Sequence, residues 1–414
     1  MRQKFIENGY EIVEFEEKAN IYVINTCTVT NMSDRKSRQI IRRVKDINNY
    51  ATLVVTGCYA QVAKDELDNI EDIDIVVGNS EKKNIVKIVE KFIETNEKQE
   101  IVADIMKQKC VTEFEVAAYT EKTRAVVKIQ DGCDRFCSYC IIPYARGRVR
   151  SRSIKDIITE ITEISKKGIK EVVITGIHIA SYGKDFKENI GLIDLLKEIN
   201  KIEGIKRIRL GSIEPTLIDK EFIEELVKLE KICDHFHLSL QSGCNETLKR
   251  MNRRYETEEF ENSANLIKNN YPNVALTTDI IVGFPGETEK EFLETYKYLD
   301  KIDFYKMHIF KYSPRKGTKA AIMENQIDGN TKESRSNKLI ELSNKKEIEH
   351  NKKYIEKVVT VLLEEREGEF IKGHTTNYIT VYVKTDKKDI ENEIVDVRIN
   401  DLYKDGITGE IKSM

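Results

Sequence analysis

The chain has 414 residues, of which 40% are hydrophobic and 34% are charged. At roughly 100–200 residues per domain, this length predicts two to four domains, each able to bury a core. The net charge of −3 excludes a protein that binds nucleic acid through a polybasic arm. No apolar run reaches the ~18 residues of a membrane span, and the first residues lack the apolar stretch of a secretory signal, so we expect a cytoplasmic protein.

The first hundred residues alternate apolar runs with helical patterns. The predicted strands are residues 21–26, 53–57 and 73–78, and the predicted helices are residues 33–46, 61–69 and 82–97. Buried strands that alternate with helices predict an α/β domain with a doubly wound parallel sheet, over residues 1–98. The mixed polar residues 99–118 are predicted to be a connector.

From residue 119 to residue 350 the alternation of strands and helices restarts. The predicted strands are residues 125–130, 171–176, 206–212, 235–240, 275–284 and 304–310. Helical patterns lie between them, for example over residues 153–167 and 287–301. Six βα units over this length predict a partial (β/α)6 barrel rather than a closed eight-stranded one.

Residues 351–414 follow a charged helical pattern over residues 332–353 and have a different character. The predicted strands are short and alternating, at residues 358–363, 370–375, 378–384 and 393–402. Turn signals stand at residues 367–368 and 405–406. This pattern predicts a small all-β barrel, in the class that includes OB-like nucleic-acid binders.

Three of the eight cysteines lie within eight residues. Cys133, Cys137 and Cys140 follow a predicted strand in C-x3-C-x2-C spacing. Three thiolates on one short loop can hold three irons of a cubane [4Fe–4S] cluster and leave the fourth iron open to amino and carboxylate groups of a substrate. The alternative is three buried or zinc-binding cysteines, but a zinc site would need a fourth Cys or His, and residues 141–148 contain none.

Two further cysteines, Cys27 and Cys58, each end a predicted strand. They are about one βα unit apart, so both are expected at the carboxyl edge of neighbouring parallel strands, where ligands gather. Spacing alone leaves two interpretations open, because small residues also fill space at strand ends. Cys233 and Cys244 precede a strand and follow a Gln-Ser-Gly turn, and we expect both to be packing residues.

Basic clusters over residues 35–45, 146–152 and 249–254 indicate contact with RNA phosphates. In the second cluster the arginines alternate, so an extended segment would present them on one side. The candidate RNA-binding residues are Arg38, Arg42, Arg43, Arg146, Arg148, Arg150, Arg253 and Arg254. Tyr378 and Tyr382 are candidate stacking surfaces in the C-terminal barrel. A charge run is more often a solvated face, as we expect for the helix over residues 332–353.

Longer segments of the chain resemble the methylthiotransferase family of the radical S-adenosylmethionine (SAM) superfamily. The resemblance is carried by GCDRFCSYCIIPYARGRVRSR, TGIHIASYG, LGSIEP, LSLQSGCNETLKRMNRRY, DIIVGFPGETE and FKYSPRKGTKA, with VINTCTVTN and VTGCYAQ before them. It covers nearly the whole chain and is closest to the tRNA threonylcarbamoyladenosine methylthiotransferases. The C-terminal barrel resembles the TRAM domain of that family.

The resemblance implies that Cys133, Cys137 and Cys140 hold a [4Fe–4S] cluster whose open iron binds SAM. One electron passed to the sulfonium then yields a 5′-deoxyadenosyl radical. The resemblance also implies that Cys27 and Cys58 are two of three ligands of an auxiliary [4Fe–4S] cluster. The third ligand is expected on a strand upstream of Cys27, so we predict a sequence truncated by about 20–35 residues. Cys110 matches no cysteine of the family.

Glycines and polar side chains at the predicted strand ends of the barrel are candidates for binding SAM. Gly176 and Gly283 allow a ligand to approach the backbone, and Glu214 and Gln241 end predicted strands. The family resemblance places the SAM amino group at TGIHIA and the adenine at IIVGFPGE. Tyr139, inside the cysteine loop, is a candidate for packing near the adenine. The alternatives are turn chemistry or solvated polar groups, and for Tyr139 a plain core aromatic.

The leading hypothesis is an enzyme that replaces the C2–H of N6-threonylcarbamoyladenosine 37 in tRNA with a methylthio group, using two SAM molecules. Its expected partners are the anticodon stem-loop of tRNA and a reductant protein such as flavodoxin or ferredoxin, without a membrane. Within the same chemistry, the alternative substrates are isopentenyladenosine-37 tRNA and a ribosomal protein. Alternatives of other kinds are a catalytically degenerate RNA-binding iron–sulfur protein and a radical SAM reaction on a small molecule.

Overall fold

The computed structural model describes residues 1–108 and 123–412, so Cys110 and most of the predicted connector lie outside the described residues. The described chain forms two compact units. The first contains residues 1–108, 131–150 and 313–322, and the second contains residues 123–130, 151–312 and 323–412. Among the described residues, no helix is both long and apolar enough to cross a membrane.

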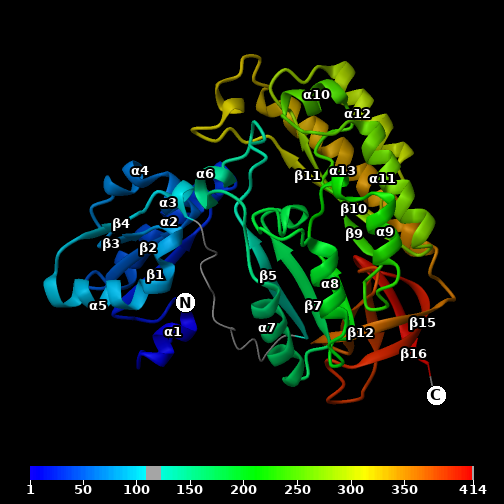
Figure 1. The fold of residues 1–414 in the computed structure, drawn as a ribbon, viewed down its shortest axis with the longest axis horizontal. Coiled ribbons are helices and arrows are strands. Elements are labelled where there is room, and N and C mark those ends of the chain that lie inside the picture. The colour runs from blue at the N-terminus through cyan, green and yellow to red at the C-terminus, as the bar shows by residue number, and fades with distance from the viewer. Residues whose placement is uncertain (109–122, 413–414) are drawn as a thin grey trace. The chain divides into compact units, whose positions relative to one another are not determined.

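The first unit contains a parallel sheet with the strand order β1-β2-β3-β4 (Figure 1, blue to cyan). Its strands are β1 (Ile21–Thr26), β2 (Thr52–Gly57), β3 (Ile75–Val77) and β4 (Gln99–Ile101). The first three confirm the predicted strands. The fourth lies within residues 99–118, which were predicted to be a connector, so that prediction is wrong for residues 99–101. Three residues with the sequence QEI carry no strand pattern of their own, and pairing with β3 is what makes them a strand.

Helices cover both faces of this sheet, as the doubly wound prediction requires. The helices are α1 (Arg2–Glu7), α2 (Asn31–Ile47), α3 (Cys58–Val62), α4 (Lys64–Asp68) and α5 (Ile85–Thr95), with the 3-10 turns η1 (Asn79–Asn84) and η2 (Ile105–Lys107). Leu53 and Val55 pack with α2, α3 and α4, whereas Val54 packs with α1 and α5. Side chains alternate along a strand, which explains this division. The predicted helix over residues 61–69 is interrupted at Ala63, between α3 and α4.

The second unit contains the partial barrel, and its six predicted strands are confirmed. They are β5 (Arg124–Asp131), β7 (Glu171–Gly176), β8 (Arg207–Leu210), β9 (His235–His237), β10 (Ala275–Val282) and β11 (Lys306–Lys311). The strands β5-β7-β8 and β9-β10-β11 pair in parallel, and a bridge between Ile213 and Leu238 joins the two groups.

Helices follow the barrel strands and cover one face of them (Figure 1, green to orange). They are α7 (Ile154–Lys166), α8 (Leu192–Asn200), α9 (Lys220–Leu226), α10 (Asn245–Arg250), α11 (Thr257–Asn270), α12 (Glu289–Lys301) and α13 (Gly329–Lys352), with the 3-10 turns η3 (Ile179–Ser181) and η4 (Pro215–Leu217). The helix α6 (Ile142–Arg146) and the 3-10 turn η5 (Lys319–Ile322) belong to the first unit, and the short strand β6 (Arg150–Ser151) stands where the chain passes from the first unit to the second. The core under the helices includes Leu210, Phe236 and Ile280. The alternate strand residues, such as Arg209 and His237, therefore point to the interior of the half-barrel.

The C-terminal residues form a closed barrel with the strand order β12-β13-β14-β16-β15, which confirms the predicted all-β barrel (Figure 1, red). Its strands are β12 (Val358–Glu367), β13 (Phe370–Thr375), β14 (Thr380–Lys384), β15 (Ile394–Tyr403) and β16 (Gly406–Ile411). The strand β16 was not predicted, because its sequence GITGEI contains two glycines, which weaken a strand pattern.

Two buried arginines of the half-barrel donate hydrogen bonds to backbone carbonyls of the C-terminal barrel. Arg207 Nη1 donates to the carbonyl of His374 at 2.9 Å, and Arg209 Nη1 donates to that of Thr376 at 2.7 Å. The ring of Tyr378 lies 4.6 Å from the Arg209 guanidinium carbon, and Tyr382 is buried. The prediction that these two tyrosines are RNA-stacking surfaces is therefore wrong, since one packs between the two barrels and the other is covered by Phe370, Tyr403 and Lys404.

Candidate functional site

Cys27 and Cys58 lie at the same carboxyl edge of the N-terminal sheet, as predicted. The last residues of their strands, Thr26 and Gly57, are partners in the β1–β2 register. Gly57 has a φ of 109°, and a Cβ at this position would collide with the Thr26 carbonyl oxygen. Only glycine therefore allows the chain to turn here from β2 into α3, which begins at Cys58. Cys27 is exposed and Cys58 is buried.

Arg146 is the cationic partner of this cysteine edge. Its Nε donates to Cys58 Sγ at 3.1 Å, and its Nη1 lies 3.7 Å from Asp131 Oδ2. Burial lowers the pKa of the Arg146 guanidinium, but Cys58, Asp131 and Cys27 together raise it above its usual value. The guanidinium therefore orients the Cys58 sulfur, as groups around a ligating side chain commonly do. Asn79 Nδ2 makes a second, longer contact of 3.8 Å with Cys58 Sγ.

Cys133, Cys137 and Cys140 lie on the loop between β5 and α6, and backbone hydrogen bonds hold this loop. Cys133 N donates to the Gly147 carbonyl at 3.0 Å, and Cys140 N donates to the Cys137 carbonyl at 2.9 Å. The preceding Gly132 has a φ of 73°, and a Cβ there would collide with the backbone of Arg148. A glycine at positive φ thus precedes Cys133 in this loop, as it precedes Cys58 in the other cysteine segment.

The sulfur donors of this loop fit an iron–sulfur cluster. Cys133 is buried, and Cys137 and Cys140 are half-buried and line a cavity of about 150 Å³. Thiolates are soft ligands that select iron–sulfur clusters or zinc over hard cations such as Mg²⁺. The loop therefore carries three sulfur donors of the type that the sequence predicted. Two of them line a cavity that a bound group can enter. Tyr139 is half-buried on the same loop.

A buried network of charges stands at the strand ends of the half-barrel. The carboxylate of Glu214, only 2% exposed, lies 3.1 Å from His178 Nε2 and 3.4 Å from Arg253 Nη2. His178 N in turn donates to the side-chain oxygen of Gln130 at 2.9 Å. Glu214 was among the predicted SAM-binding residues, and the structure places it at the predicted edge. His178 follows the end of β7 and was missed, although it stands in the TGIHIA segment.

Arg253 was predicted to bind RNA, but in the structure its side chain is not accessible to RNA. Its side chain is only 8% exposed, and its Nε donates to the Tyr255 hydroxyl at 2.9 Å. The arginine therefore faces Glu214 and the barrel edge, because the segment after α10 turns it inward. A buried guanidinium needs such a carboxylate partner, and Glu214 supplies it.

The other predicted SAM-binding residues also stand at strand ends. Gln241 is buried, with a φ of 72°, and its N donates to the Asp279 carbonyl at 2.9 Å. Gly176 ends β7, and Gly283 follows β10 with its N–H donated to the Glu287 carboxylate at 3.1 Å. Together with Glu214, these residues form the carboxyl edge of the half-barrel, where ligands of parallel sheets bind.

The basic residues divide into buried and exposed groups. Arg150 is only 4% exposed and lies 3.6 Å from Asp131, and Arg146 ends the helix α6, so the prediction of an extended segment with its arginines on one side is wrong. Arg38 is half-buried and donates to the Tyr59 hydroxyl at 2.8 Å. The predicted RNA-binding residues that stay exposed are Arg42, Arg43, Arg148 and Arg254.

Three further residues with polar or sulfur-containing side chains are buried: Arg315, Cys233 and Cys244. Arg315 was missed, and it is buried beside the loop after β1, where it donates to Thr28 Oγ1 at 2.5 Å and pairs with Asp34. Its position in the FKYSPRKGTKA segment was the available signal. Cys233 and Cys244 are both buried, in agreement with a packing role, and burial raises the pKa of the Cys233 thiol to about 12.

Comparison with known proteins links these features to families. Residues 1–78 match the uncharacterized protein family UPF0004, and residues 127–299 match the radical SAM superfamily. The chain is 43% identical over 403 residues to the threonylcarbamoyladenosine tRNA methylthiotransferase MtaB of Bacillus subtilis (strain 168), with 96% of this chain and 89% of that protein covered.

A second relative has another substrate in its name. The chain is 38% identical over 387 residues to the tRNA-2-methylthio-N(6)-dimethylallyladenosine synthase of Thermoanaerobacter sp. (strain X514), with 92% of this chain and 80% of that protein covered. Among solved structures, the chain is similar to the radical SAM methyltransferase TsrM of Kitasatospora setae, with a TM-score of 0.56, 16% identity, and 74% of this chain and 65% of that chain covered. That likeness shows a shared fold.

Proposed function

This chain belongs to the radical SAM methylthiotransferase family, and we propose that it adds a methylthio group to C2 of N6-threonylcarbamoyladenosine at position 37 of tRNA. Its membership makes it a radical SAM tRNA methylthiotransferase that uses SAM and [4Fe–4S] chemistry. The observation that carries the proposed nucleoside is the 43% identity to MtaB across 96% of this chain.

The first cluster would be held by Cys133, Cys137 and Cys140. When bound, the cluster and SAM supply the one-electron chemistry that opens an unactivated C–H bond, which lies beyond acid–base catalysis. The chain contributes a loop that is held by the backbone hydrogen bonds of Cys133 and Cys140.

We assign the orientation of SAM to the strand-end residues Gly176, Glu214, Gln241 and Gly283, and its adenine to Tyr139. The Glu214 carboxylate is fixed from two sides, by His178 and Arg253, and is almost wholly removed from water. A charge held in this way interacts more strongly with a polar ligand than a solvated one does. A Cβ on Gly283 would collide with the Lys332 side chain and one on Gly176 would press on Gln130, so glycine lets the chain pack closely at these two strand ends.

Cys27 and Cys58 are proposed as two ligands of an auxiliary [4Fe–4S] cluster. The hydrogen bond from Arg146 to Cys58 Sγ supports this role, because ligating side chains are commonly oriented by a second group. Two thiols leave more than one iron of a cubane without a protein ligand, so the proposal includes a third ligand besides them.

The contacts with RNA are assigned to the exposed arginines Arg42, Arg43, Arg148 and Arg254. Exposed guanidinium groups bind phosphates bidentately, and their binding weakens with salt. The anticodon stem-loop is the part of tRNA that carries position 37. The electron is assigned to a reductant protein of the flavodoxin or ferredoxin class.

The proposed nucleoside is tested by mass spectrometry of tRNA nucleosides from cells with and without the gene. We expect the methylthio form of threonylcarbamoyladenosine to disappear, and to return when the gene is restored but not when its Cys137→Ala variant is. The 38% identity to a dimethylallyladenosine synthase favours a second candidate, isopentenyladenosine-37. Loss of that methylthio nucleoside instead, or an unchanged tRNA with an altered ribosomal protein, would contradict the proposal.

Iron counting after anaerobic reconstitution tests the cluster assignment separately. About eight irons per chain are expected for two cubanes, and about four for an RNA-binding protein that keeps one, at four irons each. A chain with four irons that forms no 5′-deoxyadenosine would be the catalytically degenerate alternative.

A further inference from the structure

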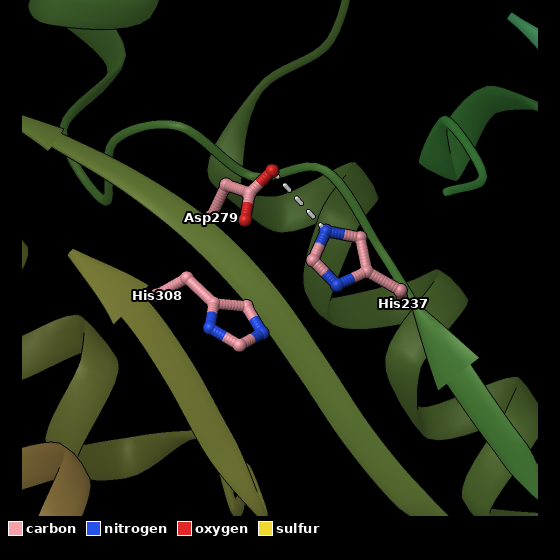
Figure 2. A group of neighbouring side chains, drawn as sticks. All are labelled: His237, Asp279 and His308. Atoms are coloured by element: carbon pink, nitrogen blue, oxygen red, sulfur yellow. Dashed lines mark ion pairs between the residues drawn. The ribbon is translucent and has the colours of Figure 1, made fainter. Parts of the chain in front are cut away.

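Three side chains with metal-binding atoms meet on one face of the half-barrel sheet. They are His237 at the end of β9, Asp279 in β10 and His308 in β11 (Figure 2). The strand register brings them together: His237 pairs with Thr277, and His308 pairs with Asp279. Since Thr277 and Asp279 are two residues apart, all three side chains lie on the same face. One ligand atom of each lies within 4.8 Å of the others.

This face is the interior of the half-barrel, opposite the one that the helices cover. The neighbouring residues Phe236 and Ile280 point the other way, into the core under the helices. The side chains of His237 and Asp279 are 13% and 31% exposed, and His308 is exposed. The cluster is therefore sheltered on one side and open to a small ligand on the other.

The ring of His237 is held as a metal-ligating imidazole is usually held. Its Nδ1 lies 3.0 Å from Thr277 Oγ1, which fixes the ring orientation. Its Nε2 points at Asp279 Oδ2 at 3.3 Å, and this buried nitrogen has no hydrogen-bond partner among the described residues. A ligating histidine typically uses one nitrogen for the metal and the other for a neighbouring polar group. Buried polar atoms without partners are rare and call for an explanation.

We propose that His237, Asp279 and His308 form a binding site for a divalent transition-metal ion of the zinc and iron(II) class. Two imidazoles and one carboxylate are the protein ligands of open zinc sites and of the 2-His-1-carboxylate iron sites. Metal–ligand bonds of about 2.0–2.2 Å place neighbouring ligand atoms roughly 3–3.5 Å apart. The His237–Asp279 contact at 3.3 Å already has this spacing, and the ligand atom of His308 lies within 4.8 Å of both.

Such a site differs in donor chemistry from the cysteine sites of the chain. Nitrogen and oxygen donors with three protein ligands leave coordination positions that water or an oxygen group of a ligand can fill. The inference does not rest on the proposed nucleoside, because no part of the donor set depends on methylthio transfer. The competing explanation is an ion pair between His237 and Asp279, with His308 merely stacked beside it at a ring distance of 5.9 Å.

The test uses the full chain with its clusters reconstituted anaerobically and adventitious metal removed by a chelating resin. Zn²⁺ is then titrated against a zinc-binding dye, with bound zinc counted by elemental analysis. We expect the wild-type chain to bind one more equivalent than His308→Ala, and Asp279→Asn to bind that equivalent at least tenfold more weakly. The matched control is His374→Gln, since His374 contacts the carboxylate of Glu364 at 2.9 Å in the C-terminal barrel and should keep the full stoichiometry.

Zinc-edge X-ray absorption separates this site from zinc bound to cysteine. We expect nitrogen and oxygen scatterers at about 2.0–2.1 Å and no sulfur at about 2.3 Å. Equal zinc binding by wild type and both variants, or sulfur scatterers alone, would overturn the proposal and leave the ion-pair explanation. Circular dichroism identifies a misfolded variant, and the near-isosteric Asp279→Asn then decides. Neither readout measures methylthio transfer, so the outcome is independent of the nucleoside experiment.

Discussion

The carboxyl edge of the N-terminal sheet and that of the half-barrel are built alike but carry different chemistry. The first presents Cys27 and Cys58, with one guanidinium 3.1 Å from Cys58 Sγ. The second presents Glu214, fixed between His178 and Arg253. In both, parallel strands end together and so bring side chains from distant positions of the chain to one edge. The fold thus supplies the edge, and the residue types decide between soft sulfur ligands and nitrogen and oxygen groups.

The largest expected effect is at the cysteine loop, because there the thiols have no substitute. Cys137→Ala should abolish the formation of 5′-deoxyadenosine from SAM with dithionite, and should lower the iron content by about four per chain. Cys233→Ala is the control, since Cys233 is a buried thiol that lies outside the cysteine loop. A Cys137→Ala chain that still cleaves SAM would remove this loop from the catalytic site.

The next largest effect is expected at the half-barrel edge, in the free energy of unfolding. Glu214→Gln keeps the shape but leaves the buried Arg253 without a charged partner, so we expect a loss of about 3–5 kcal/mol in the free energy of unfolding. Denaturant unfolding measures this loss. Glu163→Gln, which breaks only the exposed pair with Lys166, should cost at most about 1 kcal/mol. Equal losses in the two variants would show that Glu214 is not the buried partner of Arg253.

The two edges also differ in how far the sequence predicted them. The cysteine loop is local, so the spacing of Cys133, Cys137 and Cys140 is enough to predict an iron–sulfur site. Cys27 and Cys58 required the strand assignment as well, and regular βα alternation gave it correctly. The glycines before Cys58 and Cys133 were visible as sequence, but the close backbone approaches that require them were not.

At the half-barrel edge the sequence predicted where residues lie along the fold better than which side chains they contact. Glu214 was placed correctly, yet Arg253 was read as part of a basic surface, because KRMNRR does not show that one arginine turns inward. His237, Asp279 and His308 come from three different strands, and only the strand register unites them. Likewise β4 and β16 exist through pairing with neighbours rather than through their own pattern.

A smaller effect is expected where a guanidinium supports the cysteine edge. Arg146→Met removes the hydrogen bond to Cys58 Sγ and the positive charge, while keeping much of the apolar bulk. Loss of such a supporting group typically costs about 10–100-fold in metal affinity. We therefore expect the proposed auxiliary cluster to lose its iron to a chelator faster, as followed by absorbance, while the proposed cluster at the Cys133 loop keeps its iron. Arg146→Lys should give an intermediate rate, and an unchanged rate in Arg146→Met would separate Arg146 from the cluster.

The smallest effect distinguishes the exposed arginines from the buried ones. Arg148 is 53% exposed, and its guanidinium contacts the exposed Asp134 and the ring of Phe136, so Arg148→Ala should weaken tRNA binding and lower the salt slope of log K by about one. Arg150, two residues on, is 4% exposed and bound to Asp131, so Arg150→Ala should lower the thermal stability instead. Fluorescence anisotropy with tRNA at several salt concentrations measures the slope. If Arg150→Ala also changed the slope in a folded chain, the RNA surface would include residues that the structure buries, and the division between accessible and structural arginines would fail.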